Sequence, residues 1–386
     1  MLKNLLILDL LRIERSQINY IYKELSEAEI AALLEGEILE VQFRHHIFSD
    51  NEVNIFLDID KIKQVEMKVN YLLLQCEKKG IKILTYFDKS YPAVLKQIHN
   101  PPMFLYLLGN DELLYGDKTI SCVGTRNPTS NAIKDVNNIV EGLVKEDFII
   151  LSGLAYGIDI QAHKVCLDRN GKTIAVLAHG LDTIYPKQHV KVAETIVKEG
   201  GLLISEYPPG TSIRKENFVA RNRIVSGLSK GVIVFEAKEN SGTMHTARFA
   251  YKQGRRIFCP VERNEGEQLS SGVIKLLSSN SAFPIKKAQD IIEYLGYKSS
   301  KTEMVIKEKN GVKTQYHDMI KTMSVDINDS DIEKMIKGKS KKRTIDINFE
   351  IYEEVKSYAH NNNLTIKQVV NLLLYGFIKQ RGEKSE

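Results

Sequence analysis

The chain has 386 residues, enough for two or three domains with buried cores. Its 54 lysines and arginines exceed its 49 acidic residues by only 5, so the charge permits nucleic acid as a partner but does not require it. The four cysteines lack the spacing of a zinc site, and no apolar run is long enough to cross a membrane. We therefore expect a cytoplasmic protein with reduced thiols, no metal and no membrane partner.

Residues 1–78 have the apolar spacing of helices, with one glycine, Gly36, and no proline. This pattern predicts an α-helical N-terminal domain. The apolar runs 80–85 and 103–108 are separated by proline-rich turns. We expect them to be short strands that lead into the main sheet.

From about residue 119 to 261, apolar runs alternate with helix-patterned segments. The predicted strands are 119–123, 148–151, 173–177, 202–204, 232–235 and 256–259. Such alternation is typical of a parallel sheet covered by helices, so we assign 79–297 to a Rossmann-like α/β domain. Ligands of such sheets bind outside the carboxyl ends of the strands, so residues in the following loops are expected to converge on one site.

Residues 298–342 are polar and lysine-rich and predict a linker. In 343–386 an alternating strand precedes two predicted helices, 351–360 and 365–379, an order that resembles the ribbon-helix-helix fold. This module is a candidate for dimerisation or for contact with duplex DNA. Asp346 on the strand is electrostatically unsuited to a DNA groove, which leaves dimerisation without sequence reading as the alternative.

One segment combines arginines with the start of a helix. Arg221 and Arg223 flank Asn222 in what we predict to be a cationic turn. A buried strand follows, and Ser241 or Thr243 is expected to cap the next helix. The free N–H groups at that helix start and the two arginines together indicate an anion site, with phosphate as the expected anion.

Two other loops belong to the same expected site. Gly124 follows the first strand of the alternating region and is expected to let the backbone approach a ligand, while Arg126 is expected to grip a phosphate. Ser152, Gly153 and Gly157 lie in a glycine-rich loop after the second strand. That loop matches neither a dinucleotide fingerprint nor a P-loop, so we expect no nucleotide cofactor.

Acidic residues also follow the strands. Glu206 and Glu236 suit general acid–base work, but they equally suit anchoring the two arginines, which we favour. Asp159 and His163, four apart on a predicted helix, are a candidate hydrogen-bonded pair, although capping and packing roles suit them better. The loops after the strands contain many hydrogen-bond donors and few nucleophilic side chains, which favours binding a phosphodiester over cleaving one.

Several short motifs in the α/β region occur in an order that is found in a known family. They are Val123-Gly-Thr-Arg126, Ser152-Gly-Leu-Ala-Tyr-Gly-Ile-Asp159, Gly180-Leu-Asp182, Arg221-Asn-Arg223 with Ser226-Gly-Leu-Ser229, and Ser241-Gly-Thr243. In this order they resemble the DNA-processing protein A family (DprA, also called Smf), over about half of the chain. The resemblance implies a Rossmann-like domain that binds single-stranded DNA without sequence preference. It also implies a homodimer without enzymatic activity that loads the RecA recombinase during natural transformation or related recombination.

The resemblance also implies site residues. Arg126 matches the arginine that grips a backbone phosphate, and Arg221, Arg223 and Thr243 are expected to line the same pocket. The complete candidate DNA-binding set is Gly124, Thr125, Arg126, Ser152, Gly153, Gly157, Lys187, Arg221, Asn222, Arg223, Ser241, Gly242 and Thr243. Residues 262–297 depart from the family pattern, which leaves open whether they keep the family's dimer surface.

The leading hypothesis is a single-stranded DNA-binding protein that protects incoming DNA and loads RecA. One alternative is a nucleotide or phosphoribosyl hydrolase, or a nucleotide sensor, of the Rossmann-like type, with Glu206 or Glu236 as its acid–base group. Another alternative is a DNA-binding regulator in a mobile element or defence system, in which the C-terminal module determines the target.

Overall fold

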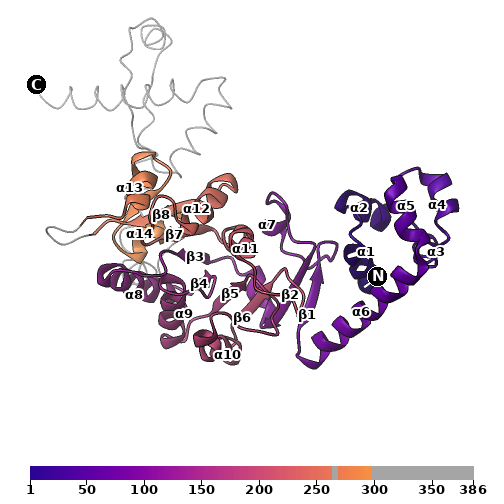
Figure 1. The fold of residues 1–386 in the computed structure, drawn as a ribbon. Helices are drawn as coiled ribbons and strands as arrows, with labels where there is room; N and C mark the ends of the chain where they lie inside the picture. Colours follow the sequence, from indigo (N-terminus) through magenta and orange to yellow (C-terminus); the bar gives the residue numbers. More distant parts are fainter. Residues whose placement is uncertain (263–267, 298–386) are drawn as a thin grey trace, which may run out of the picture. The chain divides into compact units, whose positions relative to one another are not determined.

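The computed structural model of the protein describes residues 1–262 and 268–297 (Figure 1). These residues form fourteen α-helices, two 3₁₀ helices and nine strands. The predicted linker, 298–342, and the predicted ribbon-helix-helix module, 343–386, lie outside the described residues. No helix within the described ranges reaches the length and apolar character that a membrane span requires.

The first six helices confirm the predicted helical region at the N-terminus. Their bounds are α1 (Leu2–Leu10), α2 (Arg15–Glu24), α3 (Glu27–Leu34), α4 (Ile38–His45), α5 (Asp50–Leu57) and α6 (Ile59–Lys78). Capping boxes begin α3 and α5, where Ser26 pairs with Glu29 and Ser49 with Glu52. The apolar faces of these helices form a buried cluster that continues onto the sheet through Tyr106.

One mixed sheet forms the centre of the α/β region. Its strands are β1 (Lys82–Thr85), β2 (Phe104–Gly109), β3 (Thr119–Val123), β4 (Ile149–Ser152), β5 (Thr173–Leu177), β6 (Leu202–Ser205), β7 (Gly231–Val234), β8 (Arg256–Pro260) and β9 (Phe283–Ile285). Their spatial order is β1-β2-β6-β5-β4-β3-β7-β8-β9. The strand β2 is antiparallel to both neighbours, while the seven strands from β6 to β9 in this order are parallel.

The sequence predicted this sheet well. Every strand predicted between residues 119 and 261 is present, with bounds that differ by at most one residue. These strands are mostly apolar, and nearly all of their residues are buried, because helices cover both faces of the sheet. The short strand β9 was not predicted, since three residues are too few to show a periodicity.

Helices on the two faces confirm the Rossmann-like class. One face carries α8 (Ser130–Val144), α9 (Ile158–Asp168), α10 (Val190–Lys198) and α14 (Ala288–Tyr294). The other face carries α7 (Ala93–Lys96), α11 (Lys215–Gly227), α12 (Gly242–Lys252) and α13 (Ser271–Ser278). The 3₁₀ helices are η1 (Asp111–Tyr115) and η2 (Lys187–His189).

The strand order reverses beside β3. From β3 the chain proceeds through β4, β5 and β6 in one direction, and then returns to place β7 on the other side of β3. The two loops that leave β3 and β7 therefore diverge to opposite sides of the sheet. Such a reversal opens a crevice at the carboxyl ends of the strands, and ligands of open α/β sheets bind there.

The arginine segment is helical, which corrects the predicted cationic turn. Arg221 and Arg223 lie within α11, which runs without interruption from Lys215 to Gly227. No proline interrupts the segment, and Ile224 and Val225 bury against the sheet. The prediction failed because burial of this apolar pair extends the helix upstream through the polar residues.

Burial also fixes the state of titratable side chains in the core. All four cysteines are free and buried. The imidazole of His163 is fully buried, with its Nδ1 2.7 Å from the Thr173 hydroxyl. That hydroxyl donates to the carbonyl of Ile150 at 2.7 Å, so Nδ1 must carry the proton and donate to Thr173. His163 therefore packs in the core and does not pair with Asp159.

His163 predicts a loss of stability in acid. Desolvation lowers the pKa of His163 from 6.5 to about 3, so the unfolded chain takes up a proton in this interval while the folded chain does not. The contribution of His163 to the free energy of unfolding is fully present above pH 6.5 and falls by about 1.4 kcal/mol for each pH unit below it. Urea denaturation of the wild type and of His163→Leu between pH 7 and pH 5 measures this slope. We expect a shallower slope for the variant, and equal slopes would contradict the assignment.

Candidate functional site

A cavity of about 590 Å³ lies at the carboxyl ends of β3 and β7, and we call it the switch-point pocket. Of the predicted site residues, those that line it are Gly124, Thr125, Arg126, Arg221, Asn222, Ser241, Gly242 and Thr243. They come from the loop after β3, from α11 and from the start of α12, which are far apart in sequence. The fold thus brings most of the predicted set together.

The N-terminus of α12 supplies backbone donors to this pocket. The helix begins at Gly242, and the side chain of its N-cap residue, Ser241, accepts no hydrogen bond from the first amides, which corrects the predicted Ser241 cap. A Cβ on Gly242 would meet no atom within 4 Å, so the backbone is open on this side. Free N–H groups at the positive end of a helix dipole bind anions.

Two exposed cations stand beside the helix start. Arg126 and Lys215 both line the pocket and are exposed, and neither forms an ion pair within the part of the chain that the structure describes. The guanidinium carbon of Arg126 lies 5.9 Å from the centre of the Phe218 ring. Stacking on an aromatic ring orients the guanidinium without consuming its hydrogen-bond donors.

Aromatic rings form another wall of the pocket. Phe218 on α11 and Tyr185 in the loop after β5 have ring centres 5.8 Å apart at an angle of 64°. Both line the cavity, and Tyr185 is 40% exposed. The pocket therefore combines cationic and backbone donors with ring faces on which planar groups can stack.

Arg221 lies under the pocket and is a structural cation. It is 3% exposed, and its guanidinium donates to the carbonyl of Gly153 at 2.9 Å and to the carbonyl of Val176. The buried carboxylate of Asp159 lies near it and accepts from the amide of Gly153 at 3.1 Å. Burial lowers the pKa of Arg221 to about 10, so the group remains charged at neutral pH. For Asp159, burial raises the pKa and the charge of Arg221 opposes this rise.

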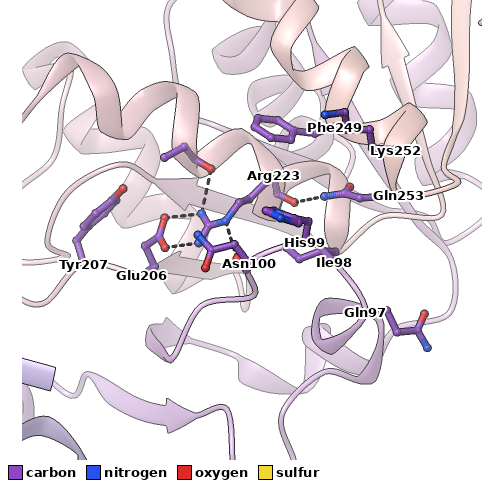
Figure 2. Close-up of a pocket in the computed structure, with 11 residues that line it drawn as sticks. Gln97, Ile98, His99, Asn100, Glu206, Tyr207, Arg223, Phe249, Lys252 and Gln253 are labelled. Carbon is purple, nitrogen blue, oxygen red and sulfur yellow. Dashed lines mark hydrogen bonds and ion pairs between the residues drawn. The ribbon is translucent and has the colours of Figure 1, made fainter. Parts of the chain in front are cut away.

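Arg223 lies in a different cavity, which corrects the expectation that the two arginines share a pocket. Its guanidinium donates to both carboxylate oxygens of Glu206, at 2.7 and 2.6 Å, and to the carbonyl of Asn100 at 2.9 Å (Figure 2). On an α-helix, residues two apart point about 200° apart, so Arg221 and Arg223 face opposite sides of α11. The cavity beside Arg223 has a volume of about 570 Å³, and we call it the Arg223 pocket.

Two of the predicted glycines, Gly124 and Gly157, serve packing. Gly124 and Gly157 allow the loop after β3 to pack closely against the loop after β4. A Cβ on Gly124 would collide with Ile158, and one on Gly157 with the backbone of Thr125. Gly124 also lines the switch-point pocket, so the side where a Cβ would stand is filled by Ile158 while another side of the residue borders the cavity. Gly157 also has a φ of +76°, which disfavours other residues.

Three other predicted residues lie outside the switch-point pocket. A Cβ on Gly153 would collide with the guanidinium of Arg221. The hydroxyl of Ser152 is buried and donates to the carbonyl of Cys122 at 2.6 Å. Lys187 is exposed on η2 and does not line the cavity.

The two candidate acid–base groups have structural partners. Glu206 anchors Arg223, as favoured from the sequence. Glu236 does not anchor Arg221; it accepts from the amide and the hydroxyl of Thr129, both at 2.9 Å, at the start of α8. With both carboxylates engaged in this way, the geometry gives no support to the hydrolase alternative.

The sequence analysis missed Lys215 as a site residue. Lys215, Phe218 and Asn222 are spaced three and four apart and line the same pocket from α11. This spacing is visible in the sequence once the segment is taken as a helix. It was hidden by the assignment of a turn to the arginines.

Comparisons with known proteins match the α/β region of the chain. The family profile described as DNA recombination-mediator protein A matches residues 82–296. The chain is 39% identical over 236 residues to DNA processing protein DprA of Bacillus subtilis (strain 168), which covers 61% of this chain and 78% of that protein. It is 41% identical over 223 residues to Protein Smf of Synechocystis sp., and the aligned region covers 57% of this chain and 55% of that protein.

Solved structures are similar over the same region. DNA processing protein A from Streptococcus pneumoniae aligns with a TM-score of 0.54 and 31% identity, covering 69% of this chain and 97% of that one. DNA processing protein A from Helicobacter pylori aligns with a TM-score of 0.50 and 32% identity, covering 56% and 97%. The Helicobacter structure is described in terms of a unique single-stranded DNA binding mode.

The Arg223–Glu206 pair predicts a large loss of stability on truncation. The two side chains are 9% and 15% exposed, so Arg223→Met leaves a carboxylate unpaired in a nearly buried position. We expect a loss of about 3–5 kcal/mol in urea denaturation, and recovery of a large part of it in Arg223→Met/Glu206→Met. Arg126→Ala is the matched control at an exposed arginine and should change stability by less than about 0.5 kcal/mol. Equal effects of the two single variants would show that the pair is not a structural element.

Proposed function

The chain belongs to the DNA recombination-mediator protein A family, and on this basis we propose that it binds single-stranded DNA at the switch-point pocket and mediates recombination. The observation that carries the proposal is the juxtaposition of exposed Arg126 with the uncapped start of α12 and the ring of Phe218. The single-stranded DNA binding described for the Helicobacter relative supports the same ligand.

The pocket suits the backbone of a strand. A phosphate at the start of α12 accepts from the amides of Gly242 and Thr243, and Arg126 and Lys215 neutralise its charge. A base next to that phosphate stacks on Phe218 or Tyr185, which contributes about 1–3 kcal/mol per base. Stacking and phosphate contacts are the same for every base, so binding is tolerant of sequence.

The predicted residues divide into two roles under this proposal. Direct contact is assigned to Arg126, Thr125, Asn222, Ser241, Gly242 and Thr243, together with Lys215 and Phe218. Support of the pocket is assigned to Arg221 beneath it and to the packed glycines. Lys187 remains a candidate for contact with a strand that extends past the pocket.

Family membership also supports finer parts of the proposal. We propose that the protein acts as a homodimer without catalytic activity in the cytoplasm, that it protects incoming DNA during natural transformation, and that it loads a RecA recombinase onto the strand. The predicted ribbon-helix-helix module is proposed to add a dimer contact or a contact with duplex DNA. The proposal of a non-enzymatic role is supported by the structural engagement of Glu206 and Glu236.

Arg126→Ala tests the pocket directly. Loss of one phosphate contact should weaken binding of fluorescein-labelled oligothymidylate about tenfold, measured by fluorescence anisotropy. The dependence of log affinity on log salt should become shallower by about 0.7, because one fewer phosphate is neutralised. Arg169→Ala is the matched control. Arg169 is an exposed arginine that follows the C-terminus of α9, away from the pocket, and pairs with Glu141. Unchanged affinity and slope for Arg126→Ala would refute the pocket assignment.

Gly242→Ala tests the approach of the strand to α12 without disturbing the fold. A Cβ at this position meets open space, and alanine favours a helix start at least as well as glycine. We therefore expect an unchanged or higher melting temperature together with weaker binding, since the methyl group projects toward the phosphate. Full affinity in this variant would place the strand away from the helix start.

A further inference from the structure

The helix α6 exposes apolar side chains that the DNA site does not use. At 20 residues it is the longest helix that the structure describes, and it borders the N-terminal helical region (Figure 1). It packs against α1, α5 and β1, and its buried residues are Ile62, Val65, Val69, Leu72 and Cys76. Elsewhere on the helix, Met67, Tyr71 and Leu74 are 64%, 65% and 44% exposed. Large apolar side chains gathered on one face of a helix favour a partner that covers them.

The exposed residues have the spacing through which two helices pair. Successive steps of four and three residues along α6 give the exposed residues Asp60, Gln64, Met67, Tyr71, Leu74 and Lys78, which we call the α6 stripe. At about 100° per residue these six lie within about 80° of one another, on the side opposite the buried residues. Alternating steps of four and three place side chains along one contact line between two α-helices. The α6 stripe therefore has the geometry of a helix-pairing surface.

The two ends of the α6 stripe carry charges of opposite sign. Asp60 lies in the first turn of α6, and Lys78 lies in the last. Lys63 and Glu77 flank the stripe on one side, again near opposite ends. All four residues are exposed, and none forms an ion pair within the part of the chain that the structure describes. These charges attract a second α6 that runs in the opposite direction.

An antiparallel copy of α6 brings complementary groups together along the stripe. When Tyr71 packs on the partner's Met67, the heptad register places Asp60 opposite the partner's Lys78. A two-fold axis repeats both contacts. In a parallel pair each residue would meet its own counterpart, so Asp60 would face a carboxylate and Lys78 an ammonium. The end charges therefore select the antiparallel orientation.

The flank of the stripe gives the same register. In the antiparallel pair Lys63 lies opposite the partner's Glu77, and Asn70 lies next to its own counterpart near the two-fold axis. On the other flank Lys68 meets its own counterpart, which is one repulsion against ion pairs that each occur twice. The charges thus favour this pairing on balance.

We propose that α6 of a second copy of this chain covers the α6 stripe in antiparallel orientation. This inference rests on the homodimer part of the proposed function and is independent of the DNA site. The stripe is about 27 Å long at 1.5 Å per residue, so the contact is small and the association is weak and dependent on concentration. Because the ion pairs are exposed, salt weakens the association.

Charge reversal on the full chain tests the contact. Within one copy Lys63 and Glu77 are about 21 Å apart along the helix, too far to pair. We expect Lys63→Glu and Glu77→Lys each to weaken self-association about tenfold, because each places like charges at both symmetric positions. The combined variant Lys63→Glu/Glu77→Lys should restore the wild-type dissociation constant, measured by sedimentation equilibrium over a range of concentrations.

A cysteine near the axis tests the register. The four native cysteines are buried, so Asn70→Cys introduces a single exposed thiol. A short bismaleimide should join two copies through it, and Lys63→Glu in the same chain should lower the yield of the joined product. Lys198→Cys is the matched control at an exposed position on α10 and should give little joined product.

Tyr71→Ser tests the apolar centre. The ring is 65% exposed within one copy, so we expect an unchanged melting temperature together with self-association weakened about tenfold. Tyr251 on α12 is 69% exposed and lies outside the stripe, so Tyr251→Ser is the matched control and should change neither quantity.

Each outcome decides the inference. If the wild type associates but the α6 variants change neither the dissociation constant nor the cross-linking, the inference is overturned and the homodimer uses another contact. If the combined charge reversal does not restore association, the antiparallel pairing is wrong. If the wild type is a monomer at every concentration, the inference and the proposed homodimer are both overturned, and the stripe is left to a partner other than this chain. DNA binding is tested separately by Arg126→Ala.

Discussion

The guanidinium of Arg221 occupies a slot between the ends of β4 and β5, where it donates to the carbonyls of Gly153 and Val176 beside the carboxylate of Asp159. Burial of this cation ties two strand ends and α11 together, because leaving any of these polar groups without a partner in a dry interior is costly. Only glycine fits at position 153, since any side chain there would collide with the guanidinium. The pocket above is therefore rigid at its base, which lowers the entropy that binding must remove.

A single helix, α11, serves several environments because its residues are rotated by about 100° from one to the next. Arg221 points under the switch-point pocket, Phe218 and Asn222 line its wall, and Arg223 turns away to pair with Glu206. Neighbouring arginines thus hold different parts of the fold, while the exposed cations that line the pocket are Lys215 at the start of α11 and Arg126 from another loop. A cluster of basic residues in sequence is not a cluster in space when the residues are helical.

The chemistry of the switch-point pocket suits a nucleic acid strand. Uncapped helix amides and exposed cations recognise phosphates, and the rings of Phe218 and Tyr185 can stack on any base. None of these contacts reads the edge of a base, so affinity depends on charge and stacking along the strand.

The sequence by itself determined the parallel sheet, the helical N-terminus and the loops that carry the site, because apolar periodicity and burial set strands and helices locally. It also selected Arg126 and the start of α12, which the fold brings together in the lining of the switch-point pocket. It did not determine that Arg221 is buried, that Gly124 packs on Ile158, or that Arg223 faces a second cavity. Those outcomes depend on the rotation of α11 against the sheet and on the reversal of strand order beside β3, which place residues distant in the chain into contact. Only the tertiary structure decides which charges meet solvent and which meet each other.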